Sequence, residues 1–230
     1  MKVTWLTQAG LLFRTEGLTI MVDPYLSDSV GKVDPAKHRR IPVEESFLSV
    51  VPDVLIITHD HLDHLDPETL ERILVRDDGR VITVLASEGA YRRLVEYGCG
   101  HNYVLLAPHS VWSVGNVTFY AVKAEHSDRT AAGYIIDDGQ GTYYVSGDTL
   151  YSFDVLDEVL ELVEGGVSYA FLPINGVGNN MNAKDAADFA YELGAEKAVP
   201  LHYGLFDSID PADFDFEDSL ILTPWVETEL

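Results

Sequence analysis

Three histidines and an aspartate lie within one short segment of the chain, at His59, His61, Asp63 and His64. Side chains alternate sides along an extended segment, so His59 and His61 point the same way and can bind one metal ion. Asp63 and His64 follow where the chain turns, and they can serve a second ion. Imidazole and carboxylate ligands together suit zinc, manganese or iron rather than calcium or magnesium. The chain has 8 histidines in all, so this concentration argues against chance histidines in a polar turn.

Three more candidate ligands each follow a run of residues typical of a buried strand. His126 comes after 117–123, Asp148 after 142–145, and His202 after 198–201. Taken separately, each is an ordinary loop residue. Because all of them stand at strand ends, they can converge on one rim of the sheets. The combined set assigns His59, His61 and His126 to one ion, and Asp63, His64 and His202 to the other, with Asp148 able to bridge the two.

The elements that must position these residues are short strands. The apolar run 54–57 leads directly into His59 and suits a core strand covered on both faces. Three strands are predicted before it, and the third ends at Asp23, before Pro24. Asp23 either orients a metal ligand from behind or caps a turn. The predicted strands are 3–6, 11–15, 18–22, 54–57, 81–85, 103–106, 111–114, 117–123, 134–137, 142–145, 169–172 and 198–201.

Helices are predicted at 67–75, 87–97, 153–163 and 183–193, with N-caps at Asp66, Ser152 and Asn182 where the caps can be assigned. Strands followed by helices occur twice, which indicates an α/β (α+β) fold of two similar halves with helices outside the sheets. No linker separates the halves, so a single domain spanning 1–230 is expected. Residues after 210 are expected to form a surface tail or an edge element.

The composition limits the partners. At 230 residues and 47% hydrophobic content the chain can bury a sizeable core. Its net charge of -23 disfavours nucleic acids and anionic membrane surfaces. The single cysteine, Cys99, excludes a cysteine-based zinc cluster and is expected to be a small packing residue. No signal pattern and no apolar run near ~20 residues is present, so a cytoplasmic protein is predicted.

The segment 26–52 lacks strong periodicity and is expected to be a long loop, of the kind that often serves as a lid or a binding loop. It carries the densest basic cluster of the chain, from Lys37 to Arg40. This cluster is either solvated surface charge or the positive contact for an anionic small-molecule substrate. Arg40 is the candidate for that contact.

The ordered ligand set, with Asp148 in a Ser-Gly-Asp-Thr segment and His202 in Pro-Leu-His-Tyr, resembles the signature of the metallo-β-lactamase-fold hydrolases. The resemblance runs from Trp5 to His202. It implies a four-layer αβ/βα sandwich, two divalent ions that are zinc or manganese with iron also compatible, and a metal-bound hydroxide as nucleophile. Asp63 and Asp148 are then the catalytic carboxylates, and Gln8 stands where many relatives carry histidine.

Within that superfamily, residues 172–176, 180–182, 186–187 and 202–203 resemble the L-ascorbate 6-phosphate lactonase branch. This implies a lactone, another small ester or a sugar-phosphate lactone as substrate. The branch resemblance has two departures, because the chain is short for that lactonase and the loop 175–180 lacks the expected basic residue. Asp23 and Thr58 are predicted to orient the imidazoles, and the predicted substrate contacts are Asn175, Asn180, Tyr203 and Arg40.

Three alternatives remain open from the sequence: a small-molecule or cyclic-nucleotide phosphodiesterase, a redox-active diiron protein, and a non-catalytic metal-binding protein. The sequence is also compatible with a homo-oligomer.

Overall fold

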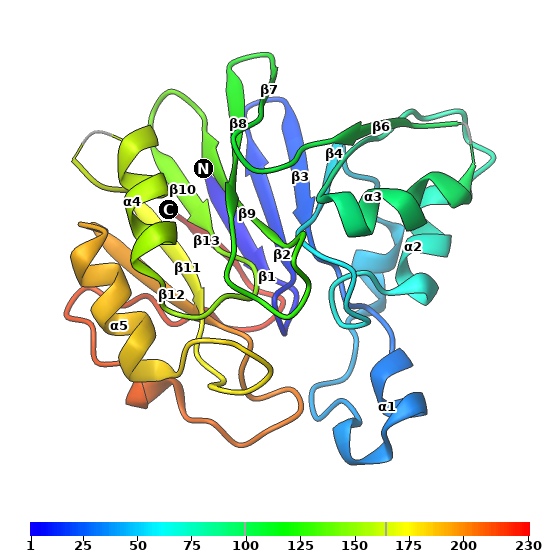
Figure 1. Cartoon of the computed structure of the whole chain (residues 1–230). Helices are drawn as coiled ribbons and strands as arrows, with labels where there is room; N and C mark the ends of the chain where they lie inside the picture. Colours follow the sequence, from blue (N-terminus) through cyan, green and yellow to red (C-terminus); the bar gives the residue numbers. More distant parts are fainter. Residues whose placement is uncertain (99, 164) are drawn as a thin grey trace. The chain divides into compact units, whose positions relative to one another are not determined.

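The computed structural model describes residues 1–98, 100–163 and 165–230, so the prediction for Cys99 lies outside the described residues. The chain divides into two compact units, each built on its own sheet (Figure 1). Unit 1 comprises Met1–Leu105, Gly204–Asp207 and Leu222–Leu230, and unit 2 comprises Leu106–Tyr203 and Ser208–Ile221.

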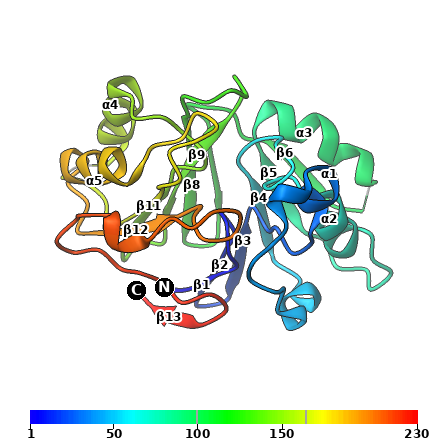
Figure 2. The same cartoon turned by 90° about the horizontal axis from the view of Figure 1, so that it is seen from below.

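Unit 1 contains a seven-stranded mixed sheet in the order β13-β1-β2-β3-β4-β5-β6. Strands β1 to β3 pair antiparallel, whereas β3 to β6 pair parallel. The last strand of the chain, β13, lies antiparallel to β1, so both chain ends lie at this edge (Figure 2). The strands are β1 (Lys2–Trp5), β2 (Leu11–Thr15), β3 (Leu18–Val22), β4 (Val54–Ile57), β5 (Thr83–Ala86), β6 (Asn102–Leu105) and β13 (Glu227–Glu229).

One face of this sheet is covered by α2 (Pro67–Leu74) and α3 (Glu88–Leu94) (Figure 1). Alternate residues of the strands, such as Leu55 and Ile57, form a buried cluster with Leu70 and Ile73 of α2. All four side chains of β4 are buried, as the apolar run predicted. Each such side chain contributes about 1.5–3 kcal/mol through burial, which fixes the strand that leads into the histidines.

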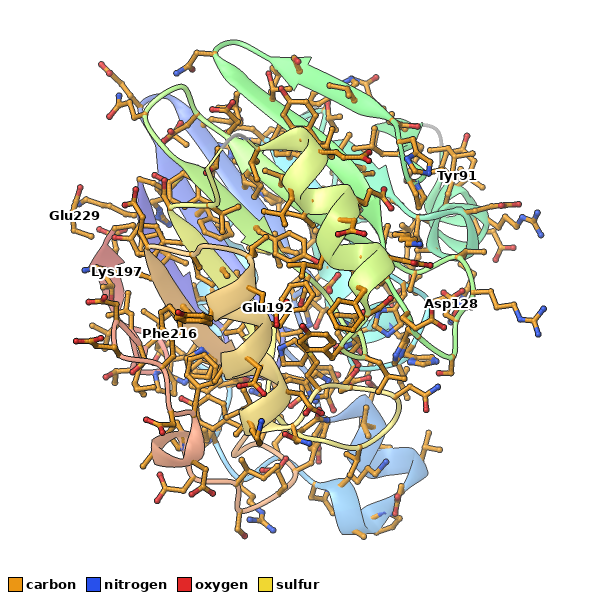
Figure 3. All side chains as sticks on the ribbon, turned by 60° about the vertical axis from the view of Figure 1, so that its left-hand side comes forward. Tyr91, Asp128, Glu192, Lys197, Phe216 and Glu229 are labelled. Carbon is orange, nitrogen blue, oxygen red and sulfur yellow. The ribbon has the colours of Figure 1, made fainter. Side chains whose placement is uncertain are left out.

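Unit 2 contains a six-stranded mixed sheet in the order β12-β11-β10-β9-β8-β7. Its helices α4 (Phe153–Leu162) and α5 (Ala183–Glu192) lie over the strands, with side chains such as Val159 and Phe189 buried (Figure 3). A short 3₁₀ turn, η4, spans Pro211–Asp213. The strands are β7 (Val111–Val114), β8 (Val117–Lys123), β9 (Ala132–Asp137), β10 (Thr142–Val145), β11 (Tyr169–Pro173) and β12 (Lys197–Leu201).

Most sequence predictions for the fold are confirmed. The class is α/β with two mixed sheets, and the C-terminal segment supplies an edge strand. Asp66 and Asn182 cap their helices by accepting hydrogen bonds from Glu68 N and Asp185 N. The prediction that 1–230 is a single domain stays a prediction. None of the helices in the described residues is long and apolar enough to span a membrane.

Two predictions differ from the structure. Ser152 precedes α4, but its hydroxyl does not cap the helix, and only its carbonyl accepts a hydrogen bond, from Leu156 N. The segment 26–52 is not a plain loop, because it contains α1 (Ser29–Val33) and the 3₁₀ turns η1 (Pro35–Lys37) and η2 (Glu45–Ser49). These elements are too short to produce a periodic pattern in the sequence. A further turn, η3 (Val95–Tyr97), extends α3.

Candidate metal centre

Asp23, which follows β3, makes hydrogen bonds to two residues of the segment that carries His59, His61, Asp63 and His64. Its Oδ1 accepts a hydrogen bond from Thr58 N at 2.8 Å, and its Oδ2 accepts one from the Thr58 hydroxyl at 2.6 Å. The same Oδ2 lies 2.7 Å from Nδ1 of His64. Since a buried carboxylate is an acceptor, His64 donates its Nδ1 proton and keeps a lone pair on Nε2. Asp23 thus contacts both Thr58 and His64.

Thr58, which donates to Asp23, also contacts the imidazole of His59. Its hydroxyl proton goes to Asp23, so its oxygen accepts from Nδ1 of His59 at 3.0 Å. His59 therefore keeps the lone pair on Nε2. Both His59 and His64 are fully buried. An imidazole whose Nδ1 proton is donated and whose Nε2 keeps its lone pair is the form that binds a metal ion.

His59 and His61 face each other as the alternation of an extended segment predicted. Nε2 of His59 lies 3.0 Å from Nδ1 of His61. Ligand atoms of Asp23, His59 and His64 also lie within 4.8 Å of one another. Two imidazole nitrogens that converge in this way, with the far nitrogen of one ring already hydrogen-bonded, fit a zinc-like ion in donor type and tautomer.

Asp63 accepts a hydrogen bond from Gln8, the residue that stands where many relatives carry histidine. The side-chain Nε2 of Gln8 donates to Oδ2 of Asp63 at 2.8 Å. Oδ2 of Asp63 also lies 3.9 Å from Nε2 of His64, which places the carboxylate beside the nitrogen with the lone pair. Gln8 is buried at the turn between β1 and β2. The Gln8 contact therefore gives Asp63 a fixed orientation.

In unit 2, Asp148 lies between two histidines. Its Oδ1 is 3.3 Å from Nε2 of His202, and its Oδ2 is 3.9 Å from Nε2 of His126. The three residues follow β10, β12 and β8, so the predicted convergence of strand ends is observed within this unit. All three side chains are buried. This is the second cluster of histidine and carboxylate groups in the chain.

The loop after β11 holds this second cluster. Nδ1 of His126 lies 3.1 Å from the carbonyl oxygen of Asn179 and donates to it, which leaves Nε2 with the lone pair. The side-chain Nδ2 of Asn180 donates to Oδ2 of Asp148 at 2.9 Å. Oδ1 of Asn180 is buried and has no hydrogen-bond partner among the described residues. The structure thus gives Asn180 a contact with Asp148, which the sequence did not predict.

Backbone strain is concentrated in the residues that position these groups. Among the residues that the structure describes, seven non-glycine residues have positive φ, and five of these belong to the two clusters or to the turns that hold them. These five are Thr7 (71°), Gln8 (50°), Asp23 (42°), Asn179 (66°) and His202 (60°). Such conformations cost about 1–3 kcal/mol each and persist where the surroundings impose them, often at functional sites. Residue spacing alone gives no sign of them.

The remaining predicted contacts stay predictions. Arg40 is exposed, and its guanidinium donates to the carbonyl of Asp207 while its backbone N–H donates to Leu205 O at 3.1 Å. Burial raises the pKa of Tyr203 to about 12, with a smaller contribution from Asp210. Asn175 pairs with Asn182 in an isolated β-bridge.

Comparison with known proteins decides the family. The family described as "Beta-lactamase superfamily domain" matches residues 19–203, a segment that contains all seven predicted ligands. The chain belongs to this superfamily. Its members with this sheet and helix arrangement have the metallo-β-lactamase fold, so the predicted fold class is confirmed.

Relatives and solved structures agree with the superfamily. The UPF0173 metal-dependent hydrolase MK1542 of Methanopyrus kandleri is 29% identical, over 94% of this chain and 91% of its own length. Igni18, a metallo hydrolase from Ignicoccus hospitalis, matches with a TM-score of 0.78 and 20% identity, over 100% of this chain and 98% of that one. A possible metal-dependent hydrolase from Veillonella parvula matches with a TM-score of 0.81 and 15% identity, over 100% and 99%.

Proposed function

We propose that the chain is a metal-dependent hydrolase that acts on a lactone or another small ester, sugar-phosphate lactones included. Membership of the superfamily, together with relatives named metal-dependent hydrolases, supports the general activity, which is metal-dependent hydrolysis. The observation that carries the proposal is the Asp23–Thr58 arrangement, which leaves Nε2 of both His59 and His64 with a lone pair. A buried carboxylate with this effect on two imidazoles serves ligation better than packing.

The ligand assignment follows the order of the family's motifs. We assign His59, His61 and His126 to one divalent ion, Asp63, His64 and His202 to the other, and Asp148 to both. Zinc and manganese fit these donors, and iron is compatible with them. When bound, such ions acidify a water molecule and polarise the oxygen of the bond to be cleaved.

Side chains of the protein would orient the catalytic carboxylates and transfer protons during the reaction. The hydrogen bond from Gln8 holds Oδ2 of Asp63, so this carboxylate can accept a proton from the attacking water without turning away. Asn180 holds Asp148 in the same manner. A tyrosine phenol is protonated at neutral pH, and burial raises the pKa of Tyr203 further, to about 12. It can therefore donate a hydrogen bond to the leaving oxygen, which stays tethered when a lactone opens.

The substrate is proposed to be a small molecule rather than a polymer or a membrane lipid. A net charge of -23 opposes approach of a polyanion, and phosphate contacts need clustered basic groups. Asn175 and the exposed Arg40 are the proposed polar contacts to the substrate. A phosphodiesterase would use the same ligands, and turnover of phosphodiesters but not lactones would favour it. Iron content with redox activity would favour a diiron protein.

The test combines metal analysis with a substrate panel. The purified protein is expected to contain about two divalent ions per chain and to hydrolyse simple lactones or sugar-phosphate lactones faster than bis(p-nitrophenyl) phosphate. Asp148→Ala should lose at least about 10³-fold in turnover, since it removes the proposed bridging ligand, while circular dichroism shows a folded protein. Unchanged hydrolysis by Asp148→Ala, or metal-free protein with full activity, would overturn the proposal.

A further inference from the structure

Arg39, in the segment 26–52, uses most of its hydrogen-bonding capacity inside unit 1. Its Nη1 donates to the carbonyls of Tyr25 at 2.6 Å and Ser27 at 3.2 Å, and its Nε donates to Ile41 O at 3.1 Å. Its Nη2 donates to the hydroxyl oxygen of Thr7 at 2.8 Å. A guanidinium has five N–H groups, so four bonds leave little capacity for an anionic substrate.

The surroundings of Arg39 keep it in place. The guanidinium carbon lies 5.1 Å from the centre of the buried Tyr25 ring, in the position of a cation–π contact. Its backbone N–H donates to Oδ1 of Asp28 at 3.0 Å, and Nδ1 of His38 lies 2.5 Å from Oδ2 of the same residue. Arg39 and His38 therefore contact the segment 25–28, whereas Lys37 and Arg40 are exposed.

Thr7, the residue that Arg39 reaches, stands in a strained turn. Thr7 and Gln8 both have positive φ, and for a β-branched residue such as threonine this is a genuine outlier. The turn is fixed by backbone bonds from Gly10 N to Thr7 O and from Leu6 N to Gly10 O, both at 2.8 Å. The indole N–H of Trp5 adds a bond to Gln8 O at 2.9 Å. The bond from Arg39 reaches Thr7 from outside the β1–β2 hairpin.

The strained turn aims one side chain at the proposed metal ligand. Gln8 leaves the turn with its Nε2 donating to Oδ2 of Asp63 at 2.8 Å. The contacts therefore run without a break from Arg39 to Thr7, along one peptide bond to Gln8, and on to Asp63. Thr7 and Gln8 are both buried and the two bonds are partly buried, so water competes less for them than for surface bonds.

We propose that Arg39 is a positioning residue for Asp63, acting through the Thr7–Gln8 turn. The inference rests on the proposed function, in which Asp63 is a metal ligand. It gives Arg39 a role that neither interpretation of the basic cluster, solvated surface charge or a contact with substrate, had assigned to it. Outer contacts of this kind typically change metal affinity by 10- to 100-fold.

The test measures zinc affinity by competition with a chromophoric chelator, so that it does not depend on turnover. Arg39→Lys is expected to weaken zinc binding by about 10- to 100-fold, because an ammonium group cannot make the forked contacts of a guanidinium. Arg92→Lys is the matched control, since Arg92 is an exposed residue of α3 in the same unit that pairs with Glu88. It should leave zinc affinity within about twofold of the unsubstituted protein.

Variants at Thr7 separate positioning from folding. Thr7→Ser keeps the hydroxyl and should retain the zinc affinity. Thr7→Gly removes the hydroxyl but relieves the positive φ, so it should weaken zinc binding while the metal-free protein melts at an equal or higher temperature. Loss of affinity in parallel with loss of folding in every variant would overturn the inference.

A double-substitution cycle tests the route. Adding Gln8→Ala to Arg39→Lys should cost little beyond the larger single effect, because both act on the same contact. Additive losses, or an Arg39→Lys protein that binds zinc as well as Arg92→Lys, would overturn the inference while the proposed function stands. An unsubstituted protein that binds none of zinc, manganese and iron would overturn both.

Discussion

Oδ2 of Asp23 lies 2.7 Å from Nδ1 of His64, inside a unit where both side chains are buried. The same oxygen accepts a hydrogen bond from the Thr58 hydroxyl, and the oxygen of that hydroxyl lies 3.0 Å from Nδ1 of His59. One carboxylate therefore determines which nitrogen of two imidazoles carries the lone pair. Asp23 sits at φ 42°, a conformation that a residue before proline rarely adopts. The strained backbone supports a role for Asp23 in orientation rather than turn formation alone.

Asp23→Asn should weaken metal binding by about 10- to 100-fold. The asparagine amide would direct an N–H group at either Thr58 N or the Nδ1 proton of His64, so one donor would face another. Equilibrium titration with zinc measures the effect. Asp53→Asn is the control, because Asp53 also accepts a backbone bond in this sheet, from Thr19 N at 2.8 Å. Equal affinities for the two variants would contradict the orienting role of Asp23.

Asn180→Asp should reduce turnover and metal affinity, each by about 10- to 100-fold. The substitution replaces a donor 2.9 Å from Oδ2 of Asp148 by a second carboxylate, and like charges at this distance disfavour ionisation of both. Metal content and steady-state kinetics measure the loss.

Asn116→Asp gives the matched control for Asn180. Asn116 is exposed, and its Nδ2 donates to Asp138 O at 3.1 Å within unit 2. This variant should keep both its metal and its activity. If the two variants behave alike, the bond from Asn180 has no role in holding Asp148.

The sequence predicted the parts of the site that depend on local spacing. The all-buried strand β4 ends at the histidines, and His59 and His61 converge because extended residues alternate sides. The contacts that orient the ligands join distant positions, with Gln8 and Asp63 separated by 55 residues and Asn180 and Asp148 by 32. Periodicity carries no information about such pairs.

The basic cluster illustrates the same limit. Arg39 and Arg40 are neighbours of the same type, and composition cannot tell which is buried. The structure places Arg39 on Tyr25 and Thr7, whereas Arg40 is exposed. The way in which the segment 26–52 packs determines which of the two arginines is exposed. This packing depends on short elements that leave no periodic pattern in the sequence.

Removal of divalent ions should lower the free energy of unfolding by about 2.7 kcal/mol per ion when the free ion stood at 100 times its dissociation constant. The reason is that the folded state gathers imidazole nitrogens, such as those of His59 and His61 at 3.0 Å, that the unfolded chain does not bring together. Urea unfolding with and without chelator measures the difference. The chelator should have a much smaller effect on a His59→Ala, His61→Ala protein, and identical unfolding midpoints for the unsubstituted protein in both conditions would contradict metal binding.

Stability should fall as the pH rises above about 10, because burial raises the pKa of Tyr25, Tyr143 and Tyr203 to about 12 and also raises that of Tyr144. An unfolded tyrosine ionises near 10, so the unfolded chain binds fewer protons than the folded one between about 10 and 12, and unfolding is favoured there. Each such group contributes at most about 1.4 kcal/mol per pH unit across that window and nothing below it. Urea unfolding at a series of pH values measures the slope, and Tyr143→Phe should reduce it, whereas Tyr191→Phe, at an 80% exposed position, should not. A free energy of unfolding that stays constant from pH 9 to about 11.5 would show that these phenols ionise as freely in the folded protein as in the unfolded chain.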